Sequence, residues 1–292
     1  MEKLLKKAQV LIDSLPYIRT FYGKTFVIKY GGAAQVEDAL KSSFALDVVL
    51  LNFIGIRPVV VHGGGPKISE TMKKMGKEPT FVHGQRVTDK ETMDIVEMVL
   101  GGLINKEIVA LINSQGGKAV GLSGKDGGLI KAKKKLIKKS ASKGNEETID
   151  MGLVGEVESI DPGILHSLEK DGFIPVISPI GVGAKGETYN INADYVASAV
   201  ASSLKAEKLM LLTDVEGIKD GNGTVLSTLS RMDVSELIND RVISGGMLPK
   251  VQACTRALDD GVKKTHIVDG RVPHCLLLEI FTREGIGTEI VG

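Results

Sequence analysis

The chain has 292 residues, of which 42% are hydrophobic and 25% are charged, and its formal net charge at pH 7 is +1. This length allows one large α/β domain or two smaller ones with a substantial core. The near-neutral charge provides no general attraction to nucleic acid or to a membrane surface. Glycine is frequent at 35 residues, whereas aromatic residues make up 4%, which favours a small polar ligand held by backbone turns over stacking on bases.

The chain contains two cysteines, Cys254 and Cys275, too few for a disulfide framework or a cysteine-based zinc site. Residues 1–16 interleave lysines with apolar residues and therefore lack the apolar core of a secretory signal peptide. No apolar run approaches the roughly 18 residues that a membrane-spanning helix needs. We therefore expect a cytoplasmic protein.

Apolar periodicity predicts strands and helices that alternate along most of the chain. The first predicted elements are a helix over residues 1–15 that ends before Pro16, a strand at 25–29, a helix at 36–51, a strand at 58–62, a helix that opens at Pro66, a helix that begins at a capping box of Thr88 and Glu91, and a helix that ends near Gly116. The later ones are a strand at 119–123, a strand at 173–178, a helix from about Asn192, strands at 209–213 and 266–269, and a last helix that contains Leu276 and Ile280.

A strand, a glycine turn and a helix recur at steps of roughly thirty residues, which indicates an α/β fold. We expect an open three-layer αβα sandwich around a mostly parallel central sheet, with an extra N-terminal helix. Residues 131–158 interrupt this alternation, and their polar, lysine-rich sequence predicts exposed β-hairpins. No long linker is present, so any two lobes should share one continuous sheet.

The lysine run at residues 131–139 could belong to a nucleic-acid-binding surface or to a solvated hairpin. No aromatic residue lies among these lysines, and Glu146, Glu147 and Asp150 follow them. Base stacking needs aromatic side chains, so the solvated hairpin is favoured. We expect no nucleic-acid partner and no membrane partner.

Two common nucleotide-binding motifs can be tested directly. The Gly-x4-Gly-Lys-Ser/Thr motif of P-loop proteins is missing, and one Gly-x-Gly-x-x-Gly pattern occurs at Gly181, Gly183 and Gly186. In a dinucleotide-binding fold a helix opens on this loop and an acidic residue ends the next strand. Here residues 188–192 precede the next predicted helix and Glu207 precedes the next strand. The pattern therefore gives little support to a dehydrogenase.

Glycine turns follow two predicted strands, at residues 29–32 (KYGG) and 62–65 (HGGG). Ligands of open α/β sheets bind beyond the carboxyl ends of strands, where glycine amides leave room for an anion. Either turn alone could be an ordinary tight turn. Lys29 stands near a strand end, where a buried ammonium group needs a charged partner. The two turns together therefore favour a phosphoryl site.

Three further segments carry polar side chains whose interpretation stays open. Arg86 could clamp a carboxylate or could be a surface arginine. Asn190, Asn192 and Asp194 occupy alternate positions, so they could converge on one ligand or could cap the following helix. Lys250 follows a flexible glycine pair at the start of a predicted helix.

In this order, the segments closely resemble the amino acid kinase family, and within it the kinases that act on N-acetyl-L-glutamate in arginine biosynthesis. The resemblance covers essentially the whole chain. No single motif is decisive, but six in this order and spacing are highly specific. The six are residues 26–32 (FVIKYGG), 60–66 (VVHGGGP), 86–89 (RVTD), 190–194 (NINAD), 212–218 (LTDVEGI) and 245–250 (GGMLPK).

The resemblance implies that the γ-phosphoryl group of ATP is transferred to the side-chain carboxylate of N-acetyl-L-glutamate, which gives an acyl phosphate and ADP. It implies that Lys29 and Lys250 flank the transferred group and stabilise the transition state, while Asp194 lies between the lysines and holds them. Positioned cations supply most of the acceleration in such a reaction. No general base is needed, because the attacking carboxylate is already ionised at pH 7.

The resemblance also implies how the ligands are held. Residues 1–204 would form a lobe for acetylglutamate and dimer formation, and residues 205–292 a lobe for ATP and an effector. Mg²⁺ would be bound by ATP phosphates and water, with no metal site made by protein side chains. The implied binding residues are the amides of Gly31, Gly32, Gly63, Gly64 and Gly65 for phosphoryl and substrate oxygens, Arg86 and Asn190 for substrate carboxylates, Asn192 in the same pocket, and Thr213, Asp214 and Gly217 for the nucleotide.

The N-terminal helix and the C-terminal segment of this chain resemble those of the arginine-inhibited subgroup of this family. In that subgroup the N-terminal helix interlaces homodimers into a hexamer, and arginine binds beside this helix and the C-terminal segment. The implied effector residues are Glu279, His266 and Gly287, with Lys205 or Lys208 nearby. From the residues alone, an apolar helical stripe should pack on something, which favours another subunit and leaves its own subunit as the alternative.

Two alternatives remain open. A kinase for N-acetyl-aminoadipate, or for its carrier-linked form, would share nearly every motif. A non-catalytic arginine-sensing protein would keep the fold but would not need both Lys29 and Lys250, so their presence together with Asp194 favours an enzyme.

Overall fold

The computed structural model of the chain describes residues 1–35, 37–82, 84–140 and 146–292. The strands of its central sheet are β1 (Thr25–Tyr30), β2 (Arg57–His62), β5 (Ala119–Ser123), β8 (Ile174–Ser178), β11 (Lys208–Thr213), β12 (Thr228–Ser230), β13 (Lys264–Asp269) and β14 (Thr288–Val291). Their order is β12-β14-β13-β11-β1-β2-β8-β5, and each neighbouring pair is parallel except β13 and β14. The predicted mostly parallel sheet is confirmed. It joins strands from residues 1–204 and 205–292.

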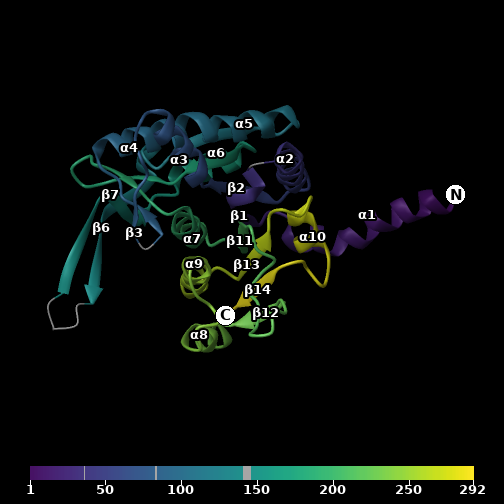
Figure 1. Cartoon of the computed structure of the whole chain (residues 1–292). Helices are drawn as coiled ribbons and strands as arrows, with labels where there is room; N and C mark the ends of the chain where they lie inside the picture. The colour runs from purple at the N-terminus through teal and green to yellow at the C-terminus, as the bar shows by residue number, and fades with distance from the viewer. Residues whose placement is uncertain (36, 83, 141–145) are drawn as a thin grey trace.

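Helices cover both faces of the sheet, as the predicted three-layer fold requires. Phe26 and Ile28 of β1 pack in the core on one face, and Val27 between them packs in the core on the other. On the first face lie α2 (Asp38–Phe53), α3 (Gly65–Lys74), α5 (Asn105–Ser114) and α10 (Cys275–Phe281), and on the second lie α6 (Gly163–Lys170), α7 (Ala193–Ser203) and α9 (Met247–Asp259) (Figure 1). An additional helix, α8 (Arg231–Asn239), packs beside α9 and β12.

Several predicted helix ends differ from those in the structure. The helix α4 (Lys90–Glu97) is capped by Asp89, whose carboxylate accepts from the Thr92 N–H at 2.8 Å. The predicted capping box at Thr88 is wrong, because the Thr88 hydroxyl donates to the Arg86 carbonyl at 2.9 Å. Between α4 and α5 the chain forms a π-helix, η2 (Met98–Ile104), which was not predicted. Val36, the predicted start of the second helix, lies outside the described residues.

The predicted hairpins are present and form a separate small sheet. Its strands, β6 (Ile130–Ser140), β7 (Glu146–Ile160), β9 (Ile180–Val182) and β10 (Thr188–Asn190), close on themselves in the order β10-β7-β6-β9. The Gly-x-Gly-x-x-Gly pattern forms the turn between β9 and β10, where Val182 pairs with Thr188. No helix opens on this turn, so the dehydrogenase interpretation is excluded. The side chains of residues 137–148, which include the last two lysines of the run, Lys138 and Lys139, together with Glu146 and Glu147, lie outside the described part.

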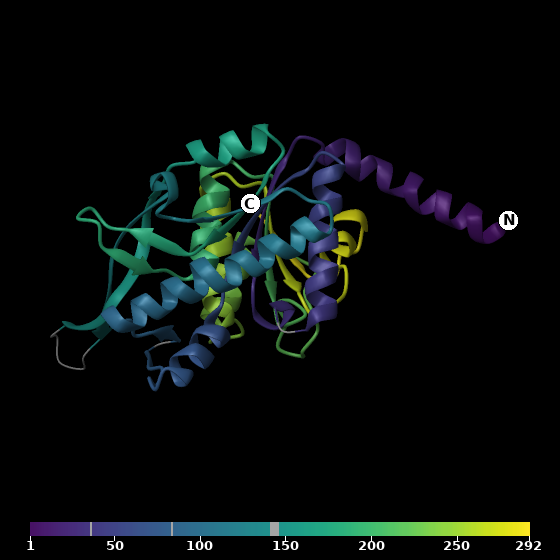
Figure 2. The same ribbon diagram turned by 90° about the horizontal axis from the view of Figure 1, so that it is seen from above.

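The N-terminal helix α1 (Glu2–Phe21) does not end before Pro16 but continues through it. Proline removes one backbone hydrogen bond, and the exposed helix leaves the freed carbonyl accessible to water. The helix projects from the body of the molecule (Figures 1 and 2). Only its last turns touch the body, where Phe21 packs on Phe26 with ring centroids 5.2 Å apart. The first sixteen residues therefore do not pack on their own subunit. None of the helices in the described ranges is both long enough and apolar enough to cross a bilayer.

Candidate active site

An aspartate lies between two lysines beyond the carboxyl end of β1. Lys29 is in β1, Asp194 is in the first turn of α7, and Lys250 is in the first turn of α9. The Lys29 Nζ atom is 3.1 Å from Asp194 Oδ1, and Lys250 Nζ donates a hydrogen bond of 3.1 Å to Asp194 Oδ2. The structure thus brings together the three residues that were predicted to be catalytic, from three distant segments of the chain.

These three side chains are largely removed from water. Their exposed fractions are 11% for Lys29, 6% for Asp194 and 18% for Lys250. Burial opposes the charged carboxylate, but the attraction of Lys29 and Lys250 outweighs burial and holds the pKa of Asp194 below its ordinary value. Two ammonium groups and one carboxylate leave one positive charge over. Because a buried charge needs a partner, the cluster is suited to an anionic ligand.

The two glycine turns border Lys29. A Cβ atom on Gly31 would lie 3.0 Å from Lys29 Nζ, so the missing side chain leaves room for the ammonium group. A Cβ atom on Gly64 would overlap Ile104 Cδ1, so only glycine lets the second turn lie against η2. The Gly63 N–H donates to the Tyr30 carbonyl at 2.8 Å, so this amide is paired within the chain, and its predicted contact with a ligand oxygen stays a prediction. Gly64 is the N-cap of α3 and Gly65 is its first residue, and backbone amides at a helix N-terminus are suited to an anionic ligand.

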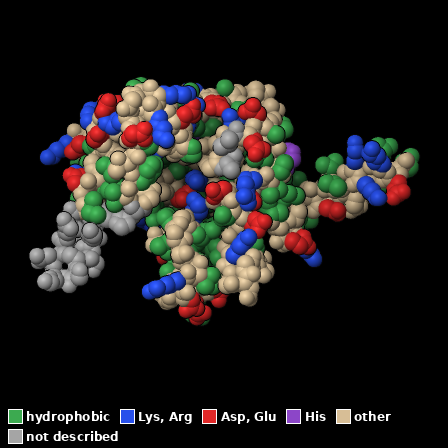
Figure 3. Space-filling view, in the orientation of Figure 1, with side chains coloured by type: hydrophobic (Ala, Val, Ile, Leu, Met, Phe, Trp, Pro, Cys, Tyr) green, Lys and Arg blue, Asp and Glu red, His purple; other side chains and the backbone are tan. Residues whose placement is uncertain are grey.

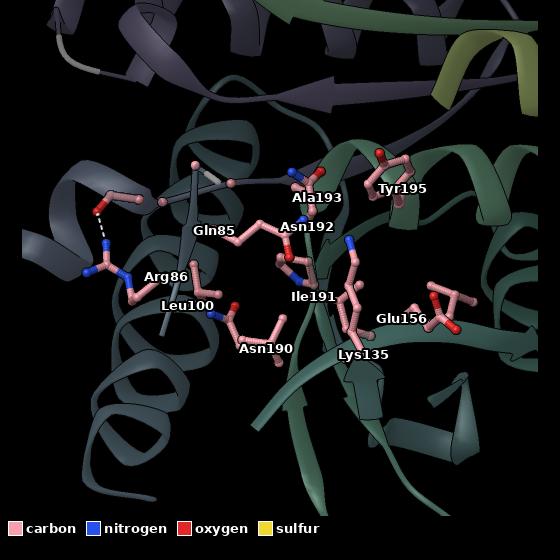
Figure 4. Close-up of a pocket in the computed structure, with 18 of the residues that line it drawn as sticks. Gln85, Arg86, Leu100, Lys135, Glu156, Asn190, Ile191, Asn192, Ala193 and Tyr195 are labelled. Carbon is pink, nitrogen blue, oxygen red and sulfur yellow. Dashed lines mark hydrogen bonds between the residues drawn. The ribbon is translucent and has the colours of Figure 1, made fainter. Parts of the chain in front are cut away.

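A cavity of about 380 Å³ adjoins these turns (Figure 4). Gly31 is absent from its lining and lies instead beside Lys29, as described above. Gly32 lines a second cavity of about 370 Å³, together with Tyr30 and Lys41. The first cavity is lined by six of the residues predicted to bind the substrate: Gly63, Gly64, Gly65, Arg86, Asn190 and Asn192.

Arg86 is 6% exposed, so the interpretation as a surface arginine is wrong. Its guanidinium donates to the Gly65 carbonyl at 2.9 Å and to the Ser69 hydroxyl at 2.8 Å, and it lies 4.7 Å from the centre of the Phe81 ring. Burial lowers the pKa of Arg86. Within the described residues no carboxylate pairs with it. A buried cation at the cavity wall without a countercharge is suited to a carboxylate ligand.

The two asparagines have different local roles. Asn190 Nδ2 donates to the Thr88 hydroxyl at 3.2 Å, which fixes its amide at the cavity wall. Asn192 is the N-cap of α7, and its Oδ1 accepts from the Asp194 N–H at 2.8 Å. The capping interpretation of Asn192 is therefore confirmed, and the same residue also lines the cavity.

Lys135 and Tyr195 line the cavity although neither was predicted to do so. In Figure 4, Lys135 rises from β6 toward Tyr195, and its Nζ atom lies 5.4 Å from the centre of the tyrosine ring. Burial lowers the pKa of Lys135. Nothing in the sequence distinguishes Lys135 from the other lysines of the run at residues 131–139, because its position depends on how the hairpin folds back. Tyr195 directly follows Asp194 in the sequence, and this adjacency to a predicted catalytic residue could have indicated that Tyr195 lies at the site.

The predicted nucleotide residues follow β11. Thr213 ends this strand and donates to Asp214 Oδ1 at 3.2 Å. Because β1 and β11 are parallel neighbours, Thr213, Asp214 and Gly217 lie at the same edge of the sheet as Lys29. In the described residues, no group of three His, Cys, Asp or Glu side chains is placed to hold a metal ion.

The predicted effector residues meet in a second buried cluster, at the opposite edge of the sheet. His266 Nδ1 lies 2.7 Å from Glu279 Oε1, and the Gly287 N–H donates to Glu279 Oε2 at 3.1 Å. Lys208 is also buried, with its Nζ atom 2.9 Å from His266 Nε2, whereas Lys205 is an exposed residue after α7. Of the two lysines left open, Lys208 therefore belongs to this cluster.

A model of the amino acid kinase family matches residues 24–269. The chain therefore belongs to the amino acid kinase family. It is 60% identical to the acetylglutamate kinase of Geotalea uraniireducens, over 100% of both chains. It is 57% identical to the acetylglutamate kinase of Sulfurihydrogenibium sp., over 99% of both chains.

Solved structures of related proteins share the fold. The N-acetylglutamate synthase of Neisseria gonorrhoeae in complex with coenzyme A and N-acetyl-glutamate matches 98% of this chain with a TM-score of 0.84 and 28% identity. The same synthase with coenzyme A and L-arginine matches 97%, with a TM-score of 0.80 and 26% identity. The chain spans 63% and 65% of the length of these synthase chains. A carbamate kinase from Giardia (92% of this chain and 99% of that chain, TM-score 0.64, 18% identity) shares the fold alone.

We predict that His62, which ends β2 and is fully buried beside the glycine turn, makes the folded chain less stable in acid. Burial lowers the pKa of His62 to about 4 from an ordinary value of 6.5. Between these pH values the unfolded chain binds a proton that the folded chain does not, so the free energy of unfolding falls as the pH decreases. The full effect corresponds to about 3 kcal/mol.

Urea unfolding at pH 7 and at about pH 4 measures this effect. The loss of stability should be smaller in His62→Asn than in the wild-type chain, because the variant has no imidazole to protonate. Equal losses in the two chains would contradict the prediction.

Proposed function

We propose that the chain transfers the γ-phosphoryl group of ATP to the side-chain carboxylate of N-acetyl-L-glutamate, which yields N-acetyl-L-glutamyl 5-phosphate and ADP. The observation that carries this proposal is the buried Lys29–Asp194–Lys250 cluster, which has one positive charge in excess beside a cavity. The full-length relatives named acetylglutamate kinase support the choice of substrate.

The chemistry requires little beyond charge and position. A carboxylate oxygen forms a bond to the γ-phosphorus while the bond from that phosphorus to the β,γ-bridging oxygen breaks, and the electron pair leaves with ADP. Charge spreads over the transferred group, where Lys29 and Lys250 stabilise it from two sides. Asp194 holds the two ammonium groups in place, one at each carboxylate oxygen. The attacking carboxylate is ionised at pH 7, so no residue needs to remove a proton.

The cavity supports the proposed orientation of acetylglutamate. Arg86 and Asn190 would bind its carboxylate groups, with Asn192 in the same wall, and the Gly64 and Gly65 amides would bind the oxygens near the phosphoryl group. N-acetyl-aminoadipate differs by one methylene group, and a pocket discriminates such a difference by only about 10- to 200-fold. The relatives' names therefore decide between these substrates, and the cavity by itself does not.

We place ATP in the lobe of residues 205–292, with Thr213, Asp214 and Gly217 beside it, and acetylglutamate in the lobe of residues 1–204. The groups around Asp194 are ammonium and amide donors, which suit phosphate oxygens and not a bare cation. Mg²⁺ is therefore proposed to be held by the ATP phosphates and water. When bound, it offsets negative charge on the phosphates. The cytoplasmic location expected from the sequence stays a prediction.

The first prediction tests the substrate. Hydroxylamine converts an acyl phosphate to a hydroxamate, so the chain with Mg·ATP should produce hydroxamate from acetylglutamate. Acetylaminoadipate should react with a lower kcat/KM, and glutamate and aspartate should react poorly. A higher kcat/KM for acetylaminoadipate would favour the alternative kinase, and the absence of product from every acceptor would favour a sensing protein.

A second prediction concerns the two lysines. Lys29→Ala or Lys250→Ala should lower kcat by on the order of 10²- to 10³-fold, with a much smaller effect on KM, because each ammonium group acts mainly in the transition state. Lys90→Ala is the matched control, since Lys90 is an exposed lysine of α4 whose ion pair, with Asp94, lies on the surface. Wild-type kcat in either active-site variant would reject the proposed roles.

We also propose that arginine inhibits the enzyme by binding near Glu279, His266, Gly287 and Lys208. The L-arginine complex of the related synthase supports a regulatory site in this fold. Phe21, at the end of α1, lies beside this cluster, with Lys208 Nζ 5.3 Å from its ring centre. Apolar and basic side chains lie exposed along α1 (Figure 3), so we propose that this helix joins homodimers into a hexamer.

The assembly proposal predicts the result of a deletion. Removal of residues 1–16 leaves Phe21 in place but removes most of the exposed apolar face of α1. We expect active dimers that arginine no longer inhibits. Light scattering would measure the mass and a kinase assay the inhibition, and hexamers that persist after the deletion would refute the proposal.

A further inference from the structure

The buried imidazole of His62 has a polar partner at each ring nitrogen. Nδ1 lies 3.0 Å from the Gly63 carbonyl oxygen, and Nε2 lies 3.2 Å from Asn105 Nδ2. Asn105 is the first residue of α5 and is itself buried. Neither residue has a role in the proposed phosphoryl transfer, yet together they connect α5 to the glycine turn at the cavity.

The surroundings fix the orientation of the Asn105 amide. Its Nδ2 group donates to the Val176 carbonyl at 2.8 Å and lies 3.4 Å from the Leu122 carbonyl, and both of these oxygens can only accept. On the other side, Lys106 Nζ donates to Asn105 Oδ1 at 3.2 Å. The Nδ2 group is therefore the one that faces His62.

This orientation determines where the proton of His62 sits. Because Asn105 Nδ2 is a donor, His62 Nε2 must accept, and the proton of the neutral ring is then on Nδ1. The Nδ1–H group donates to the Gly63 carbonyl. Burial holds the pKa of His62 at about 4, so the ring is neutral at pH 7.

The hydrogen bond from His62 Nδ1–H determines the orientation of the peptide bond between Gly63 and Gly64. The described residues, Gly63 and Gly64 among them, are joined without a cis peptide bond, and in a trans peptide the carbonyl and the following N–H point in opposite directions. A Gly63 carbonyl held toward His62, with Gln35 Nε2 also 3.5 Å away, therefore turns the Gly64 N–H away from the ring. Among the described residues this N–H has no acceptor, and Gly64 lines the cavity.

Two packing features hold Asn105 in place. A Cβ atom on Gly121 of β5 would overlap Asn105 Oδ1, so this strand leaves room for the amide. The π-helix η2 leads directly into Asn105, and Leu100 of this helix, labelled in Figure 4, would be 2.7 Å from a Cβ atom on Gly64. The segment from η2 to Asn105 thus lies against the glycine turn through Leu100 and is linked to it through Asn105 and His62.

We propose that Asn105 is a positioning residue, which selects the Nδ1–H tautomer of His62 and thereby aims the Gly64 amide at the reacting oxygens. The identity of those oxygens rests on the proposed function. The tautomer does not, and it can be measured independently of activity.

The first experiment is NMR on the chain labelled with ¹⁵N-histidine at pH 7. The His62 signals, assigned as those lost in His62→Asn, should show a neutral ring protonated at Nδ1. In Asn105→Asp the carboxylate can only accept a hydrogen bond, which favours an N–H group at Nε2, so the signals should change to an Nε2-protonated or doubly protonated ring. A wild-type ring protonated at Nε2 would overturn the proposal whatever the activity of any variant.

The second experiment is a matched pair of variants at position 62. The amide of asparagine ends where Nδ1 lies and can still donate to the Gly63 carbonyl, whereas the amide of glutamine ends near Nε2. We expect His62→Gln to lower kcat by on the order of 10²-fold, as for loss of one oxyanion donor, and His62→Asn to lower it at least about tenfold less. KM should change less than kcat in both.

Equal losses in the pair, or wild-type kcat in His62→Gln, would overturn the proposal. Gly121→Ala provides a second route if His62→Gln does not fold, since it displaces Asn105 without touching the cavity, and it should lower kcat and alter the His62 signals together. If the wild-type chain phosphorylates no acceptor, the proposed function fails. Mg·ATP binding by calorimetry then replaces kcat, and the weaker binding should again be in His62→Gln.

Discussion

The active site depends on the neutralisation of two buried ammonium groups by one carboxylate. An unpaired charge removed from water costs several kcal/mol, so neither Lys29 nor Lys250 could be buried without Asp194. The cluster forms only when β1, α7 and α9 are all docked, because each contributes one of its members. The cluster keeps one net positive charge, so a bound anion lowers the free energy of the folded chain. Stability of the site and affinity for a phosphoryl group therefore have one physical origin.

The parallel sheet sets the arrangement of everything else. Parallel strands bring their carboxyl ends to one edge, which places Lys29 and Thr213 on the same side of the molecule. The buried cluster of Lys208, His266 and Glu279 lies at the other edge, and β11 runs from Lys208 to Thr213. At about 3.3 Å per residue, the two ends of this strand are some 17 Å apart. An influence of one site on the other must pass through packed strands or through the helices beside them.

The local pattern of apolar runs and glycine turns was sufficient to predict the architecture. Continuous apolar runs in β1 and β2, each short and followed by a glycine turn, are typical of strands buried on both faces of a parallel sheet. The predicted helix ends were wrong where contacts outside the local sequence decide the structure. Thr88 looked like a helix cap, but its hydroxyl is used by the Arg86 carbonyl, and α1 continues through Pro16 because the freed carbonyl faces water. The π-helix was not predicted, and it lies against Gly64, a residue far from it in the sequence.

The sequence by itself determined the fold class and the family, because these are carried by short motifs in a fixed order. The resemblance to that family implied the three residues of the active-site cluster and Glu279, His266 and Gly287 of the second cluster. The sequence left undecided whether Arg86 is buried, which lysine joins His266, and that Lys135 and Tyr195 reach the cavity. Those questions depend on the distances between segments far apart in the chain. Only the packing of helices on the sheet fixes such distances, so the tertiary structure alone decided that Arg86 is buried without a carboxylate partner among the described residues and that Lys208 approaches His266.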